Sequence, residues 1–113
     1  MIYHAHIYWK NSDQKNIAMA QRTLLNQLNC GVGMIYDEII GPHPLPMYEV
    51  NYFDDNQEQV ENLLAKTGLS ILLHENTGDH LRDHTQGARW LGEKLSLNLK
   101  WLKRYTEGKW TKL

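Results

Sequence analysis

Four short segments of the chain are rich in residues that favour β-strands, and apolar and polar residues alternate along most of them. The segments are residues 2–9, 34–40, 47–53 and 69–74. A period of two places successive side chains on opposite faces of a sheet, so each segment predicts a strand with two distinct faces. The alternation is cleanest in the first segment, IYHAHIYW, and in the third, MYEVNYF.

Apolar residues at helical spacing separate these segments at two places. One stripe runs through residues 11–29, and its members are Ile17, Ala20, Leu24, Leu25 and Leu28. Ser12 is the expected N-cap of this helix, and Gly31 and Gly33 are its expected end. A second stripe follows Asp54 or Asp55, where either aspartate can open a capping box, and Gly68 is its stop.

The predicted order over residues 1–74 is strand, helix, strand, strand, helix, strand, which is the ferredoxin-like βαββαβ arrangement. It predicts an α+β fold with a four-stranded antiparallel sheet, two helices on one face and an open second face. The first and third strands are expected in the centre. One domain of residues 1–113 is expected, with residues 75–113 as a C-terminal extension.

The extension gives the weakest pattern. Residues 79–95 predict a short helix with Trp90 and Leu91 facing inward. Residues 95–101, LSLNLKW, alternate like a strand, and the same alternation also suits an extended packing segment.

Composition narrows the function classes. The 113 residues are 42% hydrophobic and 22% charged, with a net charge of −1, which gives no support for a nucleic-acid or anionic-membrane partner. No apolar run approaches membrane-spanning length, and the first residues lack the apolar core of a signal peptide, so a cytoplasmic location is expected. Cys30 is the single cysteine, so a metal would need nitrogen and oxygen ligands.

Histidine supplies the candidate chemistry. Four local clusters contain the six histidines, His4, His6, His43, His74, His80 and His84. Imidazole titrates near neutral pH and is the commonest transition-metal ligand, and separated clusters can converge only through folding. The segment GPHPLP around His43 is a stiff loop, because its prolines restrict the backbone.

Strand alternation places His4 and His6 together on the face that the helices leave open. Glu49 and His74 share that face on the third and fourth strands, which flank the first, so we expect His6, His74 and Glu49 to be cross-strand neighbours. Two imidazoles and one carboxylate form the facial triad of non-heme Fe(II) oxygenases. An all-histidine site of His4, His6 and His74 is the competing ligand set.

Several plainer readings stay open. An H-x-H pair by itself is weak evidence for a ligand pair, and His43 can be an ordinary loop residue. Asp83 and His84 can form a surface pair or a helix cap. The polar face and the extension can instead form a homodimer interface, with histidines that bind a structural or adventitious metal without turnover. A cofactor-free or heme-handling dimeric ferredoxin-like protein is a third reading.

Four motifs carry a resemblance to a known family. YHAHIYW, GPHPLPMYEV, LLHENTGDHLRDH and ARWLGEKLSLNL, in this order and spacing, are similar to motifs of the DOPA 4,5-dioxygenase family of small proteins. The resemblance covers nearly the whole chain, including the extension. The histidines that match the family's motifs are His4, His6, His43, His74 and His84. His80 lies where the family varies and is expected on the surface, and Glu75 stands where the family often has proline.

The resemblance implies extradiol cleavage of a catechol such as L-DOPA by O2 at a non-heme metal. Fe(II) is the expected metal, with zinc or manganese as alternatives, and the expected ligands are His6, His74 and Glu49.

A mechanistic hypothesis for this reaction assigns roles around that metal. His4 or His43 is the expected base, and His84 is expected to donate a proton or to orient a ligand. Tyr8, Tyr48 and Trp90 are the expected walls around the aromatic ring, and Arg82 or Arg89 is expected to hold a substrate carboxylate. The open sheet face makes a homodimer the expected assembly.

Overall fold

Five strands form one sheet in the computed structural model, which describes residues 1–107. The strands are β1 (Ile2–Tyr8), β2 (Gly31–Tyr36), β3 (Met47–Phe53), β4 (Ile71–Glu75) and β5 (Arg89–Leu91). They lie in the order β2-β3-β1-β4-β5, and each pairing is antiparallel. The expected ferredoxin-like core with β1 and β3 as interior strands is confirmed. The extension adds β5 at the edge of β4.

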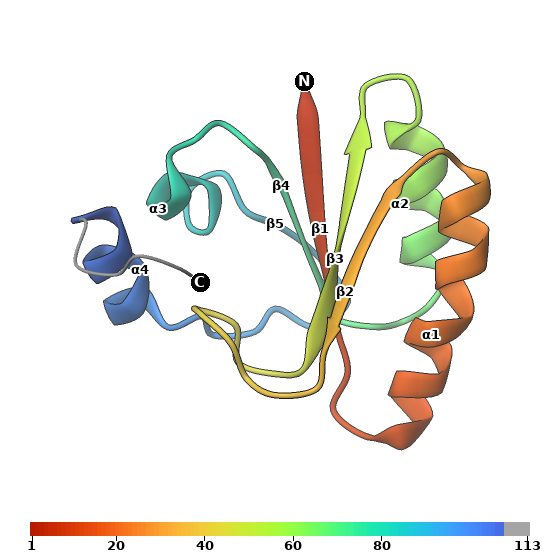
Figure 1. Ribbon diagram of the computed structural model, residues 1–113, viewed down its shortest axis with the longest axis horizontal. Helices are drawn as coiled ribbons and strands as arrows, with labels where there is room; N and C mark the ends of the chain where they lie inside the picture. The colour runs from red at the N-terminus through yellow and green to blue at the C-terminus, as the bar shows by residue number, and fades with distance from the viewer. Residues whose placement is uncertain (108–113) are drawn as a thin grey trace.

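Two helices cover one face of the sheet, α1 (Ser12–Gln27) and α2 (Gln57–Ala65) (Figure 1). The core between these layers contains the apolar side chains that alternation assigned to this face, among them Ala5, Ile7 and Val50. Because successive side chains of a strand point to opposite faces, the residues between them are left for the second face.

The helix ends differ from expectation by a few residues. The side chain of Asn11 accepts from the backbone N–H of Gln14, so Asn11 is the N-cap in place of Ser12. The first helix ends at Gln27, the left-handed residue Asn29 (φ 63°) lies in the turn that follows, and Gly31 and Gly33 belong to β2. Gly33 is needed in the strand, because a Cβ there would lie 2.9 Å from the carbonyl oxygen of Glu49 on β3.

Asn56 precedes the second helix as its N-cap, in place of Asp54 or Asp55. Its side chain makes no capping bond to that helix; the Oδ1 of Asn56 instead accepts from the backbone N–H of Phe53, and its Nδ2 donates to the carbonyl of Leu28. Asn56 therefore ties the turn before α2 to the end of α1.

The extension folds onto the second face of the sheet (Figure 1). It contains the short helix α3 (His80–Asp83), strand β5 and helix α4 (Leu99–Thr106). Trp90 was predicted in a helix and lies in a strand, whereas Trp101 was predicted in a strand or extended segment and lies in a helix. The strand forms because residues 89–91 pair with β4, and the helix begins where Asn98 accepts from the backbone N–H of Trp101. Residues 108–113 of the predicted extension lie outside the described residues.

An apolar cluster lies between the extension and the sheet. Tyr8, Met47 and Leu72 are its buried members, and Trp90, Leu95 and Leu97 of the extension pack against them. Part of the face that was expected to be open is therefore covered. The homodimer stays a prediction, and face-to-face pairing over this part of the sheet would have to displace the extension. No helix in the described part of the chain is long and apolar enough to cross a membrane.

Candidate metal and substrate site

The sheet register brings four predicted residues together. His6 lies directly opposite Glu49 on β3, and His4 lies directly opposite His74 on β4. The Nε2 atoms of His6 and His74 are 3.1 Å apart. The Oε1 atom of Glu49 is 3.0 Å from Nδ1 of His4 and 3.7 Å from Nε2 of His6. The expected convergence on the second face is therefore present.

A loop and the extension add two further histidines. His43 is buried in the proline-rich loop before β3, and its ring centroid lies 4.4 Å from that of His6. His84 follows α3, and its ring centroid lies 4.7 Å from that of His74. The five histidines that match the family motifs thus form one cluster. Two groups of three have ligand atoms within 4.8 Å of one another; they are His4, His6 and His74, and His6, His43 and His84.

Backbone carbonyls fix the orientation of two of these rings. Nδ1 of His74 lies 2.8 Å from the carbonyl oxygen of Glu75, and Nδ1 of His84 lies 2.7 Å from that of His80. A carbonyl only accepts, so each Nδ1 carries the proton and each Nε2 of the neutral ring keeps a lone pair. The contact between His6 and His74 then requires that Nε2 of His6 donates.

Burial keeps the deepest rings of this cluster uncharged. Burial, together with the neighbouring imidazoles, lowers the pKa of His43 to about 3, and burial lowers that of His74 to about 4. Burial also holds the pKa of His6 well below its usual value. Burial raises the pKa of Glu49, but the hydrogen bond from His4 and the nearby imidazoles outweigh it, so the net pKa is lowered. Neutral imidazoles and an ionised carboxylate are the forms that bind metals.

The nitrogen spacing fits a transition-metal ion. Two imidazole nitrogens that bind one ion at a right angle, each at about 2.1 Å, lie about 3 Å apart. The 3.1 Å between His6 and His74 matches this spacing. In addition, the Nδ1 atom of His6 is buried without a hydrogen-bond partner, which marks this ring as incompletely satisfied by the protein.

Helix α4 closes the pocket that contains these histidines. The pocket has a volume of about 150 Å³, and Trp101, Leu102 and Tyr105 of α4 line it. The Trp101 and Tyr105 rings stack with centroids 5.1 Å apart. Sequence reasoning missed these residues because it placed Trp101 at the end of a strand. The available signal was Asn98 as an N-cap followed by apolar residues at helical spacing.

Tyr8 and Trp90 lie beside the cluster, although neither lines the histidine pocket, and their role as walls around a substrate ring stays a prediction. The hydroxyl of Tyr8 is 2.7 Å from Nδ1 of His43, and the Tyr8 and Trp90 rings stack at 6.0 Å. His80, which was expected on the surface, is half-buried and lines the histidine pocket. Its ring meets the edge of Tyr105 at 5.0 Å.

Tyr48 lies elsewhere, which corrects its expected role as a wall of the site. It alternates with Glu49 along β3, so it packs in the core on the helix-covered face, where its hydroxyl donates to the carbonyl of Ala18. The geometry of a strand places Tyr48 and Glu49 on opposite faces, so both cannot contribute to one site.

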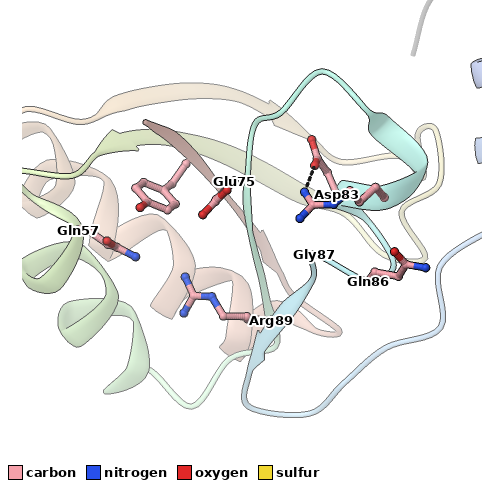
Figure 2. Close-up of a pocket in the computed structure, with 8 residues that line it drawn as sticks. Gln57, Glu75, Asp83, Gln86, Gly87 and Arg89 are labelled. Carbon is pink, nitrogen blue, oxygen red and sulfur yellow. Dashed lines mark ion pairs between the residues drawn. The ribbon is translucent and has the colours of Figure 1, made fainter.

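Arg82 does not line the histidine pocket either. It lines a separate polar pocket of about 320 Å³ with Glu75, Gln86 and Arg89 (Figure 2). Arg89 is held there by two hydrogen bonds to the carboxylate of Glu61. The expected arginine contact to a substrate carboxylate at the metal site is therefore not supported by the position of either arginine.

Asp83 is a structural residue instead of half of a surface pair. Its side chain is 1% exposed and accepts from the backbone N–H and the hydroxyl of Thr77. These bonds tie the loop after β4 to α3 and so fix the start of the segment that carries His84.

The amino-acid sequence is similar to those of several known proteins. The sequence profile of the Dopa 4,5-dioxygenase family matches residues 3–101. The chain is 37% identical to an uncharacterized 21.2 kDa protein of Botryotinia fuckeliana, over 96% of this chain and 64% of that protein. It is 29% identical to a DOPA 4,5-dioxygenase of Amanita muscaria, over 86% of this chain and 47% of that protein. The chain therefore spans less than two thirds of either relative.

A solved structure shares the fold. The crystal structure of a "putative dioxygenase" from Nostoc punctiforme superposes with a TM-score of 0.86 at 34% sequence identity. The match covers 92% of each chain, so the extension is part of the shared structure.

Proposed function

Because the chain belongs to the Dopa 4,5-dioxygenase family, we propose that it is an extradiol ring-cleaving dioxygenase that opens a catechol with O2. The names of its relatives support a dioxygenase-like activity. The observation that carries the proposal is the cluster of five histidines beside the carboxylate of Glu49, with His6, His43 and His74 buried. Such a cluster offers both metal ligands and acid–base groups in one pocket.

His4, His6 and His74 would hold the metal, for which Fe(II) is proposed, with zinc and manganese as alternatives. Their ligand atoms lie within 4.8 Å of one another, which favours the all-histidine set over the set that includes Glu49. Glu49 accepts from His4 and would orient that ring, as carboxylates do beside many metal-bound histidines. Bound Fe(II) supplies a Lewis acid for the two catechol oxygens and a redox path to O2.

His43 is the proposed base. When its Nδ1 donates to the oxygen of Tyr8, its Nε2 keeps a lone pair that can accept a proton from a catechol hydroxyl. Burial, which lowers the pKa of His43 to about 3, keeps the ring unprotonated before the substrate binds. A catecholate beside the ring would then favour its protonated form.

His84 is the proposed second acid–base group. Its ring adjoins both His43 and His74, and its Nδ1 is held by the carbonyl of His80. The ring therefore has a fixed orientation, and only its Nε2 is available to the pocket. A proton accepted at His43 can be returned to the opened product through this neighbouring ring.

Anaerobic reconstitution with Fe(II), followed by a screen of catechols in air, tests the activity. We expect O2 uptake and a yellow ring-opened product from at least one of L-DOPA, dopamine, caffeate and protocatechuate. His6→Ala and His74→Ala should lose both bound iron and turnover while keeping the circular dichroism of the folded chain. Tight metal binding without turnover of any catechol would instead indicate a non-catalytic metal-binding protein.

A further inference from the structure

A groove of about 640 Å³ adjoins the histidine pocket on the side of the extension. His84 lines both the groove and the histidine pocket, so the two spaces lie next to each other at this residue. The remaining walls of the groove are mostly apolar and include Trp90, Leu95 and Leu97. A ligand held at the histidines therefore has an apolar space next to it.

Trp90 connects the groove to the proposed base. Its indole stacks on the Tyr8 ring at 6.0 Å, and the Tyr8 hydroxyl contacts His43. Trp90 is fixed by its place in β5, where it lies opposite Leu72 of β4. The inner wall of the groove is thus attached to the sheet that carries the metal ligands, which gives the groove a fixed position relative to them.

The charged part of the groove lining is positive. Among the described residues that line it, Lys94 is the only one with a full charge, and none is an aspartate or glutamate. The nearby carboxylates already have partners: Glu49 contacts His4 and His6, Glu93 pairs with Lys10, and Asp83 accepts from Thr77. Arg82 and Arg89 line the separate polar pocket. A carboxylate in the groove would meet Lys94, whereas an ammonium would meet no opposite charge.

We propose that the groove receives the side chain of the catechol and selects an apolar chain that ends in a carboxylate over a zwitterionic one, a selectivity that rests on the proposed function. An ammonium group placed among Trp90, Leu95 and Leu97 would lose water without gaining an anionic partner, which is costly. A single carboxylate keeps one exposed lysine as its partner and leaves the apolar part of the chain in contact with the indole.

Four catechols whose side chains carry different charged groups test this selectivity. They are 3-(3,4-dihydroxyphenyl)propanoate, L-DOPA, dopamine and 4-ethylcatechol. We expect the KM of the propanoate to lie about tenfold below that of L-DOPA, because the two differ by one unpartnered ammonium. Dopamine should have a higher KM than 4-ethylcatechol for the same reason.

Lys94→Gln removes the charge of the groove while nearly keeping its shape, and so tests the charge by itself. It should raise the KM of the propanoate about fivefold, as expected for a solvent-exposed ion pair, and leave that of 4-ethylcatechol unchanged. Lys100→Gln, a change of the same kind on α4 and outside the groove, should leave all four values unchanged. Equal KM values for L-DOPA and the propanoate, or an equal effect of Lys94→Gln on all four catechols, would overturn the proposal.

Equilibrium binding keeps the two proposals separate. If none of the four catechols is turned over, the proposed function fails. The dissociation constants of the same four ligands still measure the selectivity of the groove. The order of affinities should again place the propanoate before L-DOPA, and Lys94→Gln should weaken the propanoate alone. Any other order overturns the groove proposal, whatever the fate of the enzymatic one.

Discussion

The Nε2 atoms of His6 and His74 lie 3.1 Å apart although the two residues do not face each other in the sheet. His4 is the residue opposite His74, and Leu72 is the residue opposite His6. The contact is therefore a diagonal one between neighbouring strands, which long side chains reach. Two rings that meet on such a diagonal present their nitrogens to one point.

Removing one ring of this pair should abolish tight metal binding. We expect His74→Ala to weaken Fe(II) or Zn(II) binding by more than about 100-fold, because loss of a direct ligand costs more than loss of an outer contact. Competition with a chromophoric chelator measures the affinity. Metal affinity equal to that of the unchanged chain would contradict a ligand role for His74.

Glu49→Gln distinguishes an orienting carboxylate from a ligand. The glutamine oxygen can still accept from His4, so we expect the metal affinity to fall by only about 10-fold. The same chelator competition measures this loss beside that of His74→Ala. Equal losses for the two variants would show that Glu49 binds the metal directly, which is the ligand set first expected from the sequence.

The metal-free protein should lose stability in mildly acidic solution. An unfolded histidine has a pKa near 6.5, whereas burial lowers the pKa of folded His74 to about 4 and that of folded His43 to about 3. Between these values the unfolded chain binds more protons than the folded chain, so the free energy of unfolding falls as the pH falls. The slope is about 1.4 kcal/mol per pH unit for each such histidine.

Urea denaturation of the metal-free protein at several pH values from 7 to 5 measures how the free energy of unfolding changes with pH. His43→Gln removes one of the depressed groups, so its slope should be shallower than that of the unchanged chain. A free energy of unfolding that stays constant over this range would contradict the burial of neutral imidazoles.

Tyr8→Phe tests the contact that holds His43. Loss of the hydroxyl frees the His43 ring, so we expect kcat to fall by about tenfold or more, since a misplaced base loses much of its contribution. The KM should change little, because the phenyl ring keeps its stacking with Trp90. The pH profile of kcat should shift as well.

Tyr48→Phe is the matched control, because that hydroxyl bonds to Ala18 on the opposite face of the sheet. It should cost about 1 kcal/mol of stability and leave kcat unchanged. Equal effects of the two substitutions on kcat would mean that Tyr8 acts only through the fold.

Alternation predicted the core and half of the site for a geometric reason. The period of two in β1 and β3 assigns His4, His6 and Glu49 to one face whatever the tertiary packing, and the βαββαβ order then makes these strands neighbours. The same rule excludes Tyr48, and the expectation that it lines the site overlooked its position next to Glu49. Alternation assigns residues to a face but does not give the register between strands. The diagonal contact between His6 and His74 therefore became clear only from the structure.

The extension was harder to predict because its pattern is ambiguous. Leu95, Leu97, Leu99 and Trp101 alternate, but only Leu95 and Leu97 pack on the sheet cluster, and the helix has begun by Leu99. Asn98 ends the alternation by capping α4, a local bond that competes with continued strand structure. The packing of Trp101 and Tyr105 over the histidines is a tertiary effect that no local pattern encodes.

The covering of the second face by residues of the same chain has a consequence for how the site behaves on dilution. A face completed by another molecule would separate at low concentration, whereas a tethered segment has an effective concentration set by its own short connection. Trp90, His84 and α4 all belong to that segment. The specific activity of this protein should therefore be independent of protein concentration, down to dilutions at which assembled sites come apart.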